Sequence, residues 1–186
     1  MIIFLDLDGV IINWAKGVCN WFNIPYEPEK ITSWDSLQKL TNTPDNKFWE
    51  SIKNSFFWEN LEFYPEAKNF IDELKNYGTV IFLSNPSPGC AGYRQNWIQN
   101  NLSDFFRKGH YILTSAKWAC AHKNTILIDD SDKNYESFYR AGSHAIIYPQ
   151  PWNMAGDVVY YSEKVKNDLI IKTISELKQM WVYNNG

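Results

Sequence analysis

The sequence predicts a doubly wound parallel α/β sheet that carries a helical segment after its first strand. Short runs that are apolar throughout and rich in β-branched residues recur along the chain, which is typical of strands buried on both faces. Helical patterns separate most of these runs, and polar residues follow several of them directly. Because strands that alternate with helices favour parallel pairing through crossovers, we expect one open sheet with helices on both faces.

The strand candidates differ in clarity. The clear ones are Ile2–Leu5, Thr79–Leu83, Thr125–Ile128 and Ala145–Tyr148. Weaker ones are Tyr111–Leu113 and Val158–Tyr160. All of them are too short for a typical helix, so their length favours strands.

The predicted helices fall between these strands. The stretch from Pro65 to Gly78 is the clearest, because proline occupies a first-turn position and glycine follows the end. Its apolar residues recur at helical spacing and form one stripe of Ala67, Phe70, Ile71 and Leu74. Further helices are predicted over Tyr93–Leu102, Lys133–Ala141 and Lys166–Trp181.

The segment of residues 13–64 interrupts this alternation. It shows no convincing strand and is rich in Trp, Phe, Asn and Lys, with predicted helices over Trp14–Phe22 and Pro44–Ser55. A structureless connection of this length is uncommon inside a compact domain. We therefore expect residues 1–12 and 65–186 to form the core, and residues 13–64 to form a small helical cap over the carboxyl edge of the sheet.

Composition excludes several classes of protein. The 186 residues are 45% hydrophobic and 21% charged, which is typical of a soluble globular domain. No apolar run reaches the ~18–20 residues of a membrane span, and the N-terminus lacks the basic region of a signal peptide. A net charge of −3 with scattered basic residues argues against long nucleic acid as a partner. Three cysteines without a CxxC pair argue against a disulfide framework or a zinc site, and favour a cytoplasmic protein.

Polar side chains follow three of the clear strands. Asp6-Leu7-Asp8-Gly9 follows the first, Ser84-Asn85 the second, and Asp129-Asp130 the run at Thr125–Ile128. Ligands bind at the carboxyl ends of the strands in such sheets, so we expect these groups to share one site. Four carboxylates in one place need a cation, and oxygen ligands without a His or Cys cluster point to Mg²⁺.

The same residues fit a phosphoryl-transfer site. A carboxylate can act as a nucleophile and form an aspartyl-phosphate, and Asp6 stands where the sheet would fix it. Asp8 lies two residues further and can serve as a general acid over the same site. Ser84 offers a hydroxyl to a phosphoryl oxygen, and a lysine would complete the charge balance.

With these residues in this order, the chain resembles the haloacid dehalogenase superfamily over roughly residues 2–153. Asp6-Leu7-Asp8-Gly9-Val10 is similar to its first motif, Ser84 to its second and Asp129-Asp130 to its fourth. The third motif is a lysine ahead of the last acidic strand, for which both Lys117 and Lys123 qualify. Lys117 is preferred because it follows a short predicted strand. The resemblance implies a Rossmann-like fold.

The resemblance also implies a mechanism. Asp6 would attack phosphorus and bind Mg²⁺, while Asp8 would protonate the leaving oxygen, activate water and bind the metal through its carbonyl group. Asp130 would be the metal ligand of the fourth motif, with Asp129 as an outer or alternative ligand.

The phosphoryl oxygens would be held by Ser84 and Lys117. Asn85 is a further candidate for the phosphate or the base. Arg94, on the helix after the second motif, is expected on a solvated face rather than at the phosphate.

A narrower resemblance is to the 5′(3′)-deoxyribonucleotidases, including phage and bacterial members. It rests on four features: Asn13-Trp14 after the first motif, Ile31-Thr32-Ser33-Trp34-Asp35, Phe56-Phe57-Trp58 ahead of Leu61–Pro65, and Leu127-Ile128-Asp129-Asp130 with Trp152-Asn153. The family often has Thr-Ser where this chain has Ser84-Asn85, which leaves the role of Asn85 open.

This resemblance implies a nucleoside monophosphate as the substrate. Stacking of a base on an aromatic ring is worth ~1–3 kcal/mol, and Trp14 and Trp34 are the candidate platform. The alternative is that both rings fill the small core of the cap. Aromatic residues make up 17% of the chain, so most of them are expected in the core.

Other functions stay open on the sequence alone. The same chemistry could act on another small phosphate ester such as a sugar phosphate, or on the 3′-phosphate ends of nucleic acid. A non-catalytic binding module with this fold is a further alternative, which intact catalytic positions argue against. Base preference, 5′ against 3′ phosphate, deoxyribose against ribose, and monomer against homodimer are not resolved by the sequence.

Overall fold

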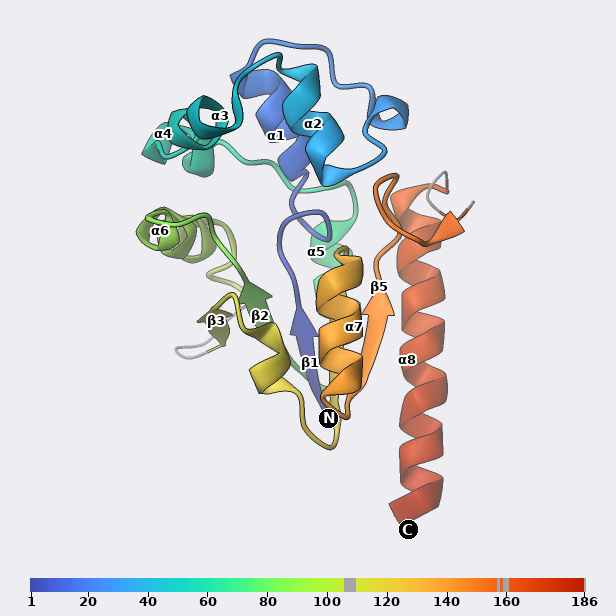
Figure 1. Cartoon of the computed structure of the whole chain (residues 1–186). Coiled ribbons are helices and arrows are strands. Elements are labelled where there is room, and N and C mark those ends of the chain that lie inside the picture. The colour runs from blue at the N-terminus through green and yellow to red at the C-terminus, as the bar shows by residue number, and fades with distance from the viewer. Residues whose placement is uncertain (106–109, 157, 159–160, 186) are drawn as a thin grey trace.

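The computed structural model describes residues 1–105, 110–156, 158 and 161–185, and for residues 34 and 182–185 only the backbone (Figure 1). Its centre is a parallel sheet with the strand order β3-β2-β1-β4-β5. The strands are β1 (Ile2–Leu5), β2 (Thr79–Ser84), β3 (Tyr111–Leu113), β4 (Thr125–Asp129) and β5 (His144–Ile147). This confirms the predicted fold class. Two of the three residues of the weak candidate at 158–160 lie outside the described residues.

Helices cover both faces of the sheet, and the alternation of side chains in the strands explains why. Ile3 and Leu5 of β1 belong to one buried cluster with apolar residues of α5 (Ala67–Leu74), α6 (Ala91–Asn101) and α8 (Glu163–Asn185). Phe4, between them, belongs to a second cluster with Phe138 of α7 (Asp132–Arg140). Both faces of the strand are therefore buried, as its continuous apolar run predicts.

The helices of the core agree with the predicted positions to within a few residues. The helix expected from Pro65 begins at Ala67, and the C-terminal helix expected over Lys166–Trp181 extends to Glu163–Asn185. Among the described residues, no helix is both long enough and apolar enough to cross a bilayer.

The segment of residues 13–64, which we call the cap segment, is helical as expected but differs in detail. It contains α1 (Trp14–Trp21), the short 3₁₀ helix η1 (Pro28–Lys30), α2 (Trp34–Leu40), α3 (Asp45–Ser51) and α4 (Ser55–Glu59). The helix predicted near Pro44–Ser55 is present as α3, but it ends at Ser51, and the Asn54 side chain caps a separate helix, α4. Helix α2 was not predicted, although Ser33 and Ser36 form a capping box at its start.

The cap segment joins the core through two chain crossings that pair with each other. Ile12 and Phe63 form an antiparallel bridge, and backbone hydrogen bonds of 2.9 Å run from Asn13 N to Glu62 O and from Tyr64 N to Ile11 O. Helices α1 to α4 lie together beyond the carboxyl ends of the strands (Figure 1). The cap segment therefore faces the edge where the polar strand ends meet.

Candidate active site

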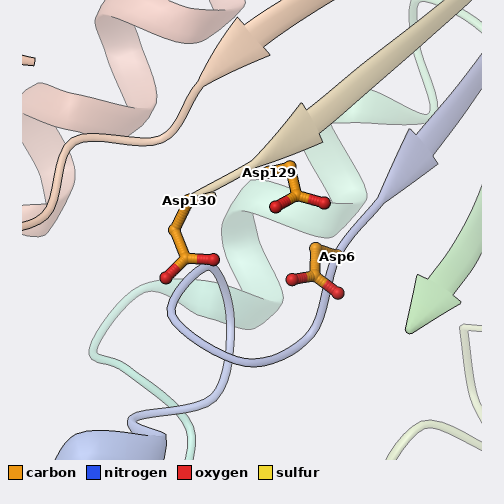
Figure 2. A group of neighbouring side chains, drawn as sticks. All are labelled: Asp6, Asp129 and Asp130. Atoms are coloured by element: carbon orange, nitrogen blue, oxygen red, sulfur yellow. The ribbon is translucent and has the colours of Figure 1, made fainter. Parts of the chain in front are cut away.

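Three carboxylates meet at the carboxyl ends of β1 and β4, which are neighbouring strands (Figure 2). Asp6 follows β1, Asp129 ends β4, and Asp130 follows it. Each offers an oxygen atom within 4.8 Å of the others, and all three side chains are buried. The sheet thus brings together the acidic residues of the first and fourth motifs, as the sequence predicts.

Gly9 shapes the turn that follows Asp6. Its backbone φ is +77°, which residues other than glycine rarely adopt. A Cβ atom at this position would collide with the Asp130 carboxylate. Gln150 Nε2 donates a hydrogen bond of 2.6 Å to the Gly9 carbonyl oxygen. Glycine is therefore required here both for the backbone conformation and for the close approach of Asp130.

Lys117 supplies the positive charge of the cluster. It lies in the short helix η2 (Lys117–Cys120), and its Nζ is 2.6 Å from Asp6 Oδ1 and 2.7 Å from Asp129 Oδ2. The other candidate lysine, Lys123, is exposed. The geometry therefore favours Lys117 for the position that the sequence left open.

Asp129 and Asp130 differ in how their oxygen atoms are used. Asp129 accepts hydrogen bonds from Lys117 Nζ, from the Ser131 backbone and from Asn134 Nδ2, which lies 3.1 Å from both oxygens. Asp130 Oδ2 accepts a hydrogen bond of 2.7 Å from Trp152 Nε1. Both oxygen atoms of Asp129 are therefore occupied by hydrogen bonds, one of which orients Lys117. Asp130 accepts this one hydrogen bond on Oδ2, so it is better placed to bind a cation.

Burial makes this cluster electrostatically costly. Removal from water raises the pKa of Asp6 to about 7; Lys117 opposes the shift, and Asp129 and Asp8 add to it. Burial, reinforced by Asp129 and Asp6, raises the pKa of Asp130 well above its usual range. Burial alone would lower the pKa of Lys117, but Asp6 and Asp129 outweigh it and hold the lysine protonated. A bound divalent cation would relieve the excess negative charge.

Ser84 ends β2, the strand that pairs with β1, and Asn85 follows it. Ser84 is fully buried, and its Oγ has no hydrogen-bond partner among the described residues. A buried hydroxyl without a partner is costly, so its presence needs an explanation. Asn85 lines the pocket above the strand ends.

Asp8 points into the same pocket, but its partner was not predicted. Arg94 Nη2 lies 2.6 Å from Asp8 Oδ1 and 2.5 Å from Asp8 Oδ2, and the Arg94 side chain is fully buried. The expectation that Arg94 occupies a solvated helix face is therefore wrong. Arg94, Trp97 and Ile98 are all buried on α6 and have the i, i+3, i+4 spacing of one helix face, which is the signal that could have placed it.

A cavity of about 650 Å³ opens between the strand ends and the cap segment. The strand ends contribute Asp6, Asp8 and Asp130 to its lining, and η2 contributes Lys117. The cap segment contributes aromatic rings and polar groups, among them Trp14, Phe48, Trp49, Trp58, Asp35 and Gln38. The volume falls within the usual range for small-molecule sites.

The two tryptophans predicted as a stacking platform fare differently. Trp14 lines the cavity but is 5% exposed, and its ring packs against that of Trp49 with the centroids 6.3 Å apart. Trp34 begins α2, and its side chain lies outside the described part of the structure. Trp49 is 39% exposed on the cavity lining and was not assigned a role from the sequence.

Comparisons with known proteins find similar sequences and similar folds. A curated 5′(3′)-deoxyribonucleotidase from Clostridium acetobutylicum is 24% identical over 138 residues, which is 72% of this chain and 75% of that protein. A haloacid dehalogenase-like hydrolase from Xanthomonas campestris superposes with a TM-score of 0.59 at 10% identity, covering 97% of this chain and 98% of that one. A variant of a haloacid dehalogenase family enzyme from Bacteroides thetaiotaomicron, with one aspartate replaced by alanine and in complex with magnesium and inorganic phosphate, superposes with a TM-score of 0.51 at 16% identity, covering 84% of this chain and 97% of that one.

The family comparison covers nearly the whole chain. Residues 1–174 match the family described as 5′ nucleotidase, deoxy (Pyrimidine), cytosolic type C protein. The match includes the first-motif carboxylates, the cap segment, Lys117 and the acidic pair at the end of β4. The chain therefore belongs to the 5′ nucleotidase, deoxy (pyrimidine), cytosolic type C family, and is a phosphoric monoester hydrolase of the nucleotidase type.

Proposed function

We propose that this protein is a Mg²⁺-dependent phosphatase of deoxyribonucleoside monophosphates that works through an aspartyl-phosphate on Asp6. The observation that carries the proposal is that Asp6, Asp130 and Lys117 line one cavity together with aromatic side chains. The neighbouring strand β2 ends at Ser84, whose hydroxyl has no hydrogen-bond partner among the described residues. The curated relative from Clostridium acetobutylicum supports the substrate class.

The carboxylates fit a magnesium ion. Asp6 and Asp130 offer hard oxygen ligands, and the backbone carbonyl of Asp8 is the third candidate. The Bacteroides thetaiotaomicron enzyme of the same fold binds magnesium and phosphate, which supports this choice of ion. Bound there, Mg²⁺ would neutralise negative charge on the phosphoryl group and on the carboxylates.

The side chains of this protein then divide the work. Asp6 Oδ attacks phosphorus, the bond to the ester oxygen breaks, and Asp8 delivers a proton to that leaving oxygen. Lys117 and the Ser84 hydroxyl donate hydrogen bonds to the phosphoryl oxygens, and Asn85 lies close enough to the cavity to join them. In the second half of the reaction, Asp8 takes a proton from the water that attacks the phosphorylated Asp6.

The cap segment would select the substrate. Its aromatic rings line the side of the cavity opposite the strand ends, where the nucleoside would lie once the phosphate is bound. Within the cavity lining, the cations Lys117 and Lys133 belong to the core, and the cap segment contributes the acidic Asp35 and Asp45. A neutral planar base suits such a wall better than a second phosphate group.

Phosphate release from a panel of monophosphates tests the proposal. We expect release from deoxyribonucleoside monophosphates in Mg²⁺ and none in EDTA, with sugar phosphates hydrolysed poorly. Hydrolysis of sugar phosphates in preference to nucleotides would keep the catalytic assignments and overturn the substrate. Absence of hydrolysis of every ester, including a generic aryl phosphate, would instead indicate a binding module.

A further inference from the structure

Arg94 occupies an unusual position for an arginine. It lies on α6, its side chain is 0% exposed, and one nitrogen atom, Nη2, contacts both carboxylate oxygens of Asp8. Asp8 itself is 18% exposed and belongs to the cavity lining. The Asp8 carboxylate lines the cavity, and the Arg94 guanidinium that binds it is buried outside the cavity lining.

The guanidinium group is itself fixed by two tryptophans. Its carbon Cζ lies 4.6 Å from the ring centroid of Trp58 on α4 and 5.9 Å from that of Trp97 on its own helix. Both rings are anchored, because Trp58 Nε1 donates to Ile52 O and Trp97 Nε1 donates to Leu61 O, each at 2.9 Å. Trp58 and both acceptors belong to the cap segment, so the position of Arg94 depends on where the cap segment lies.

The other N–H groups of the Arg94 side chain are energetically unfavourable where they lie. Nε and Nη1 are buried and have no hydrogen-bond partner among the described residues. An arginine kept only for structure would be expected to satisfy its buried N–H groups, or to be replaced by an apolar side chain. Within the described part of the chain, both hydrogen bonds of the Arg94 side chain go to Asp8.

We propose that Arg94 is a positioning residue, which holds the Asp8 carboxylate toward the reacting phosphate ester and couples its position to helix α4 of the cap segment through Trp58. This inference rests on the proposed role of Asp8 as the group that moves a proton to and from the reacting oxygen atoms. Asp8 lies in the turn between β1 and the cap segment, where the sheet no longer fixes the side chain. The contact with Arg94 supplies the orientation that the turn lacks.

Two substrates with different leaving groups test this role. A nucleoside monophosphate releases a strongly basic alkoxide that needs a proton, whereas 4-nitrophenyl phosphate releases a stabilised phenolate that does not. We expect Arg94→Met to lower kcat/KM for the nucleotide by ~30-fold or more, and for the aryl ester by less than ~3-fold. Because kcat/KM reports on steps up to the first irreversible one, later hydrolysis of the aspartyl-phosphate does not blur the comparison.

Companion variants define the expected pattern. Asp8→Asn should show the same selective loss, and adding Arg94→Met to it should cause little further loss. Trp58→Leu should reproduce part of the selective loss, because it removes the cap side of the contact. Arg140→Met is the matched control, since Arg140 is an exposed arginine paired with Glu136 and should leave both rates unchanged.

Two outcomes of the Arg94→Met experiment would contradict the positioning role. Equal losses for the two esters in Arg94→Met, or no loss in either, would overturn the positioning role. If Arg94→Met folds poorly, the double variant with Asp8→Asn removes both charges, and Trp58→Leu tests the contact with Arg94 in place. Wild-type protein that hydrolyses neither ester would refute the proposed function, and this inference with it.

Discussion

The two walls of the cavity are built in contrasting ways. On the strand-end wall, the Lys117 side chain is 2% exposed and the Asp6 side chain is 9% exposed, and the two form an ion pair of 2.6 Å. On the cap wall, Trp49 is 39% exposed and donates a hydrogen bond of 3.0 Å to the exposed Asp45. One wall is dry, charged and pre-organised, whereas the other is aromatic and partly solvated.

The difference indicates a division of labour. Electrostatic stabilisation of a reacting group is strongest where water is excluded and the charges do not move. Recognition of a planar group needs apolar area and tolerates more freedom. Changes to the strand-end wall should therefore act on turnover by orders of magnitude, and changes to the cap wall should act more modestly on substrate affinity.

The largest effect is expected at Asp6. Asp6→Asn keeps the size of the side chain but removes the nucleophilic carboxylate, so kcat should fall by at least ~10³-fold. Phosphate release with a nucleotide substrate measures it, and a single cooperative thermal transition together with an unchanged circular dichroism spectrum would show that the fold is intact. A rate within tenfold of wild type would contradict the assignment of Asp6 as the nucleophile.

Lys117 should come next. Lys117→Met removes a donor to the phosphoryl oxygens and should lower kcat by ~10²–10³-fold. It also leaves Asp6 and Asp129 without their buried cation, which should cost ~3–5 kcal/mol of unfolding free energy in the absence of Mg²⁺. Kinetics and denaturant unfolding measure the two effects. Lys123→Met is the control, because Lys123 is exposed; comparable losses there would reverse the choice between the two lysines.

The sequence predicted the position of the aspartates in these two predictions more fully than it predicted the contacts of Lys117. Asp6 and Asp129-Asp130 directly follow apolar runs, so a local pattern was enough to put them at one edge of the sheet. The short predicted strand ahead of Lys117 already favoured it over Lys123, but its contacts with Asp6 and Asp129 depend on the path of the chain after β3, which no local pattern gives.

Arg94 and Trp152 show the same limit for longer-range contacts. Arg94 lies 86 residues from Asp8, and Trp152 lies 22 residues from Asp130. Contacts at such separations arise only when the sheet and its helices assemble. The cap segment was harder still, because α2, α3 and α4 are five to seven residues long and carry little periodicity.

Magnesium should stabilise the protein through the carboxylates of the strand-end wall and not through the cap wall. The cation relieves repulsion only at the strand ends, so Mg²⁺ at about 100 times its Kd should raise the melting temperature by ~5–10 °C. Thermal unfolding with Mg²⁺ and with EDTA measures the shift. Asp130→Asn should reduce it, while Asp45→Asn on the cap wall should leave it unchanged. Equal shifts in both variants would place the cation elsewhere.

The pH dependence of the metal-free protein follows from the same carboxylates. Burial raises the pKa of Asp6 to about 7 and that of Asp130 well above its usual range, so the folded chain holds more protons than the unfolded chain from about pH 4 to 7. Their contribution to stability therefore falls as pH rises through this window. In EDTA, we expect Asp6→Asn to gain stability relative to wild type between pH 5 and pH 8. A constant difference between the two proteins would argue against the raised pKa.

The smallest effect is expected on the cap wall. Trp49→Ala removes an exposed ring from the cavity lining, so KM for a nucleoside monophosphate should rise by ~5- to 100-fold, equivalent to ~1–3 kcal/mol of stacking. KM for a small phosphate ester without a base should stay within twofold, because Lys117 and Ser84 are untouched. Phe56→Ala is the matched control, since Phe56 is 63% exposed on the cap segment but does not line the cavity. A parallel rise in KM for both esters would mean that Trp49 supports the cap segment as a whole. A loss of kcat with unchanged KM would contradict the division of labour between the two walls, because Trp49 on the cap wall would then act on turnover rather than on substrate affinity.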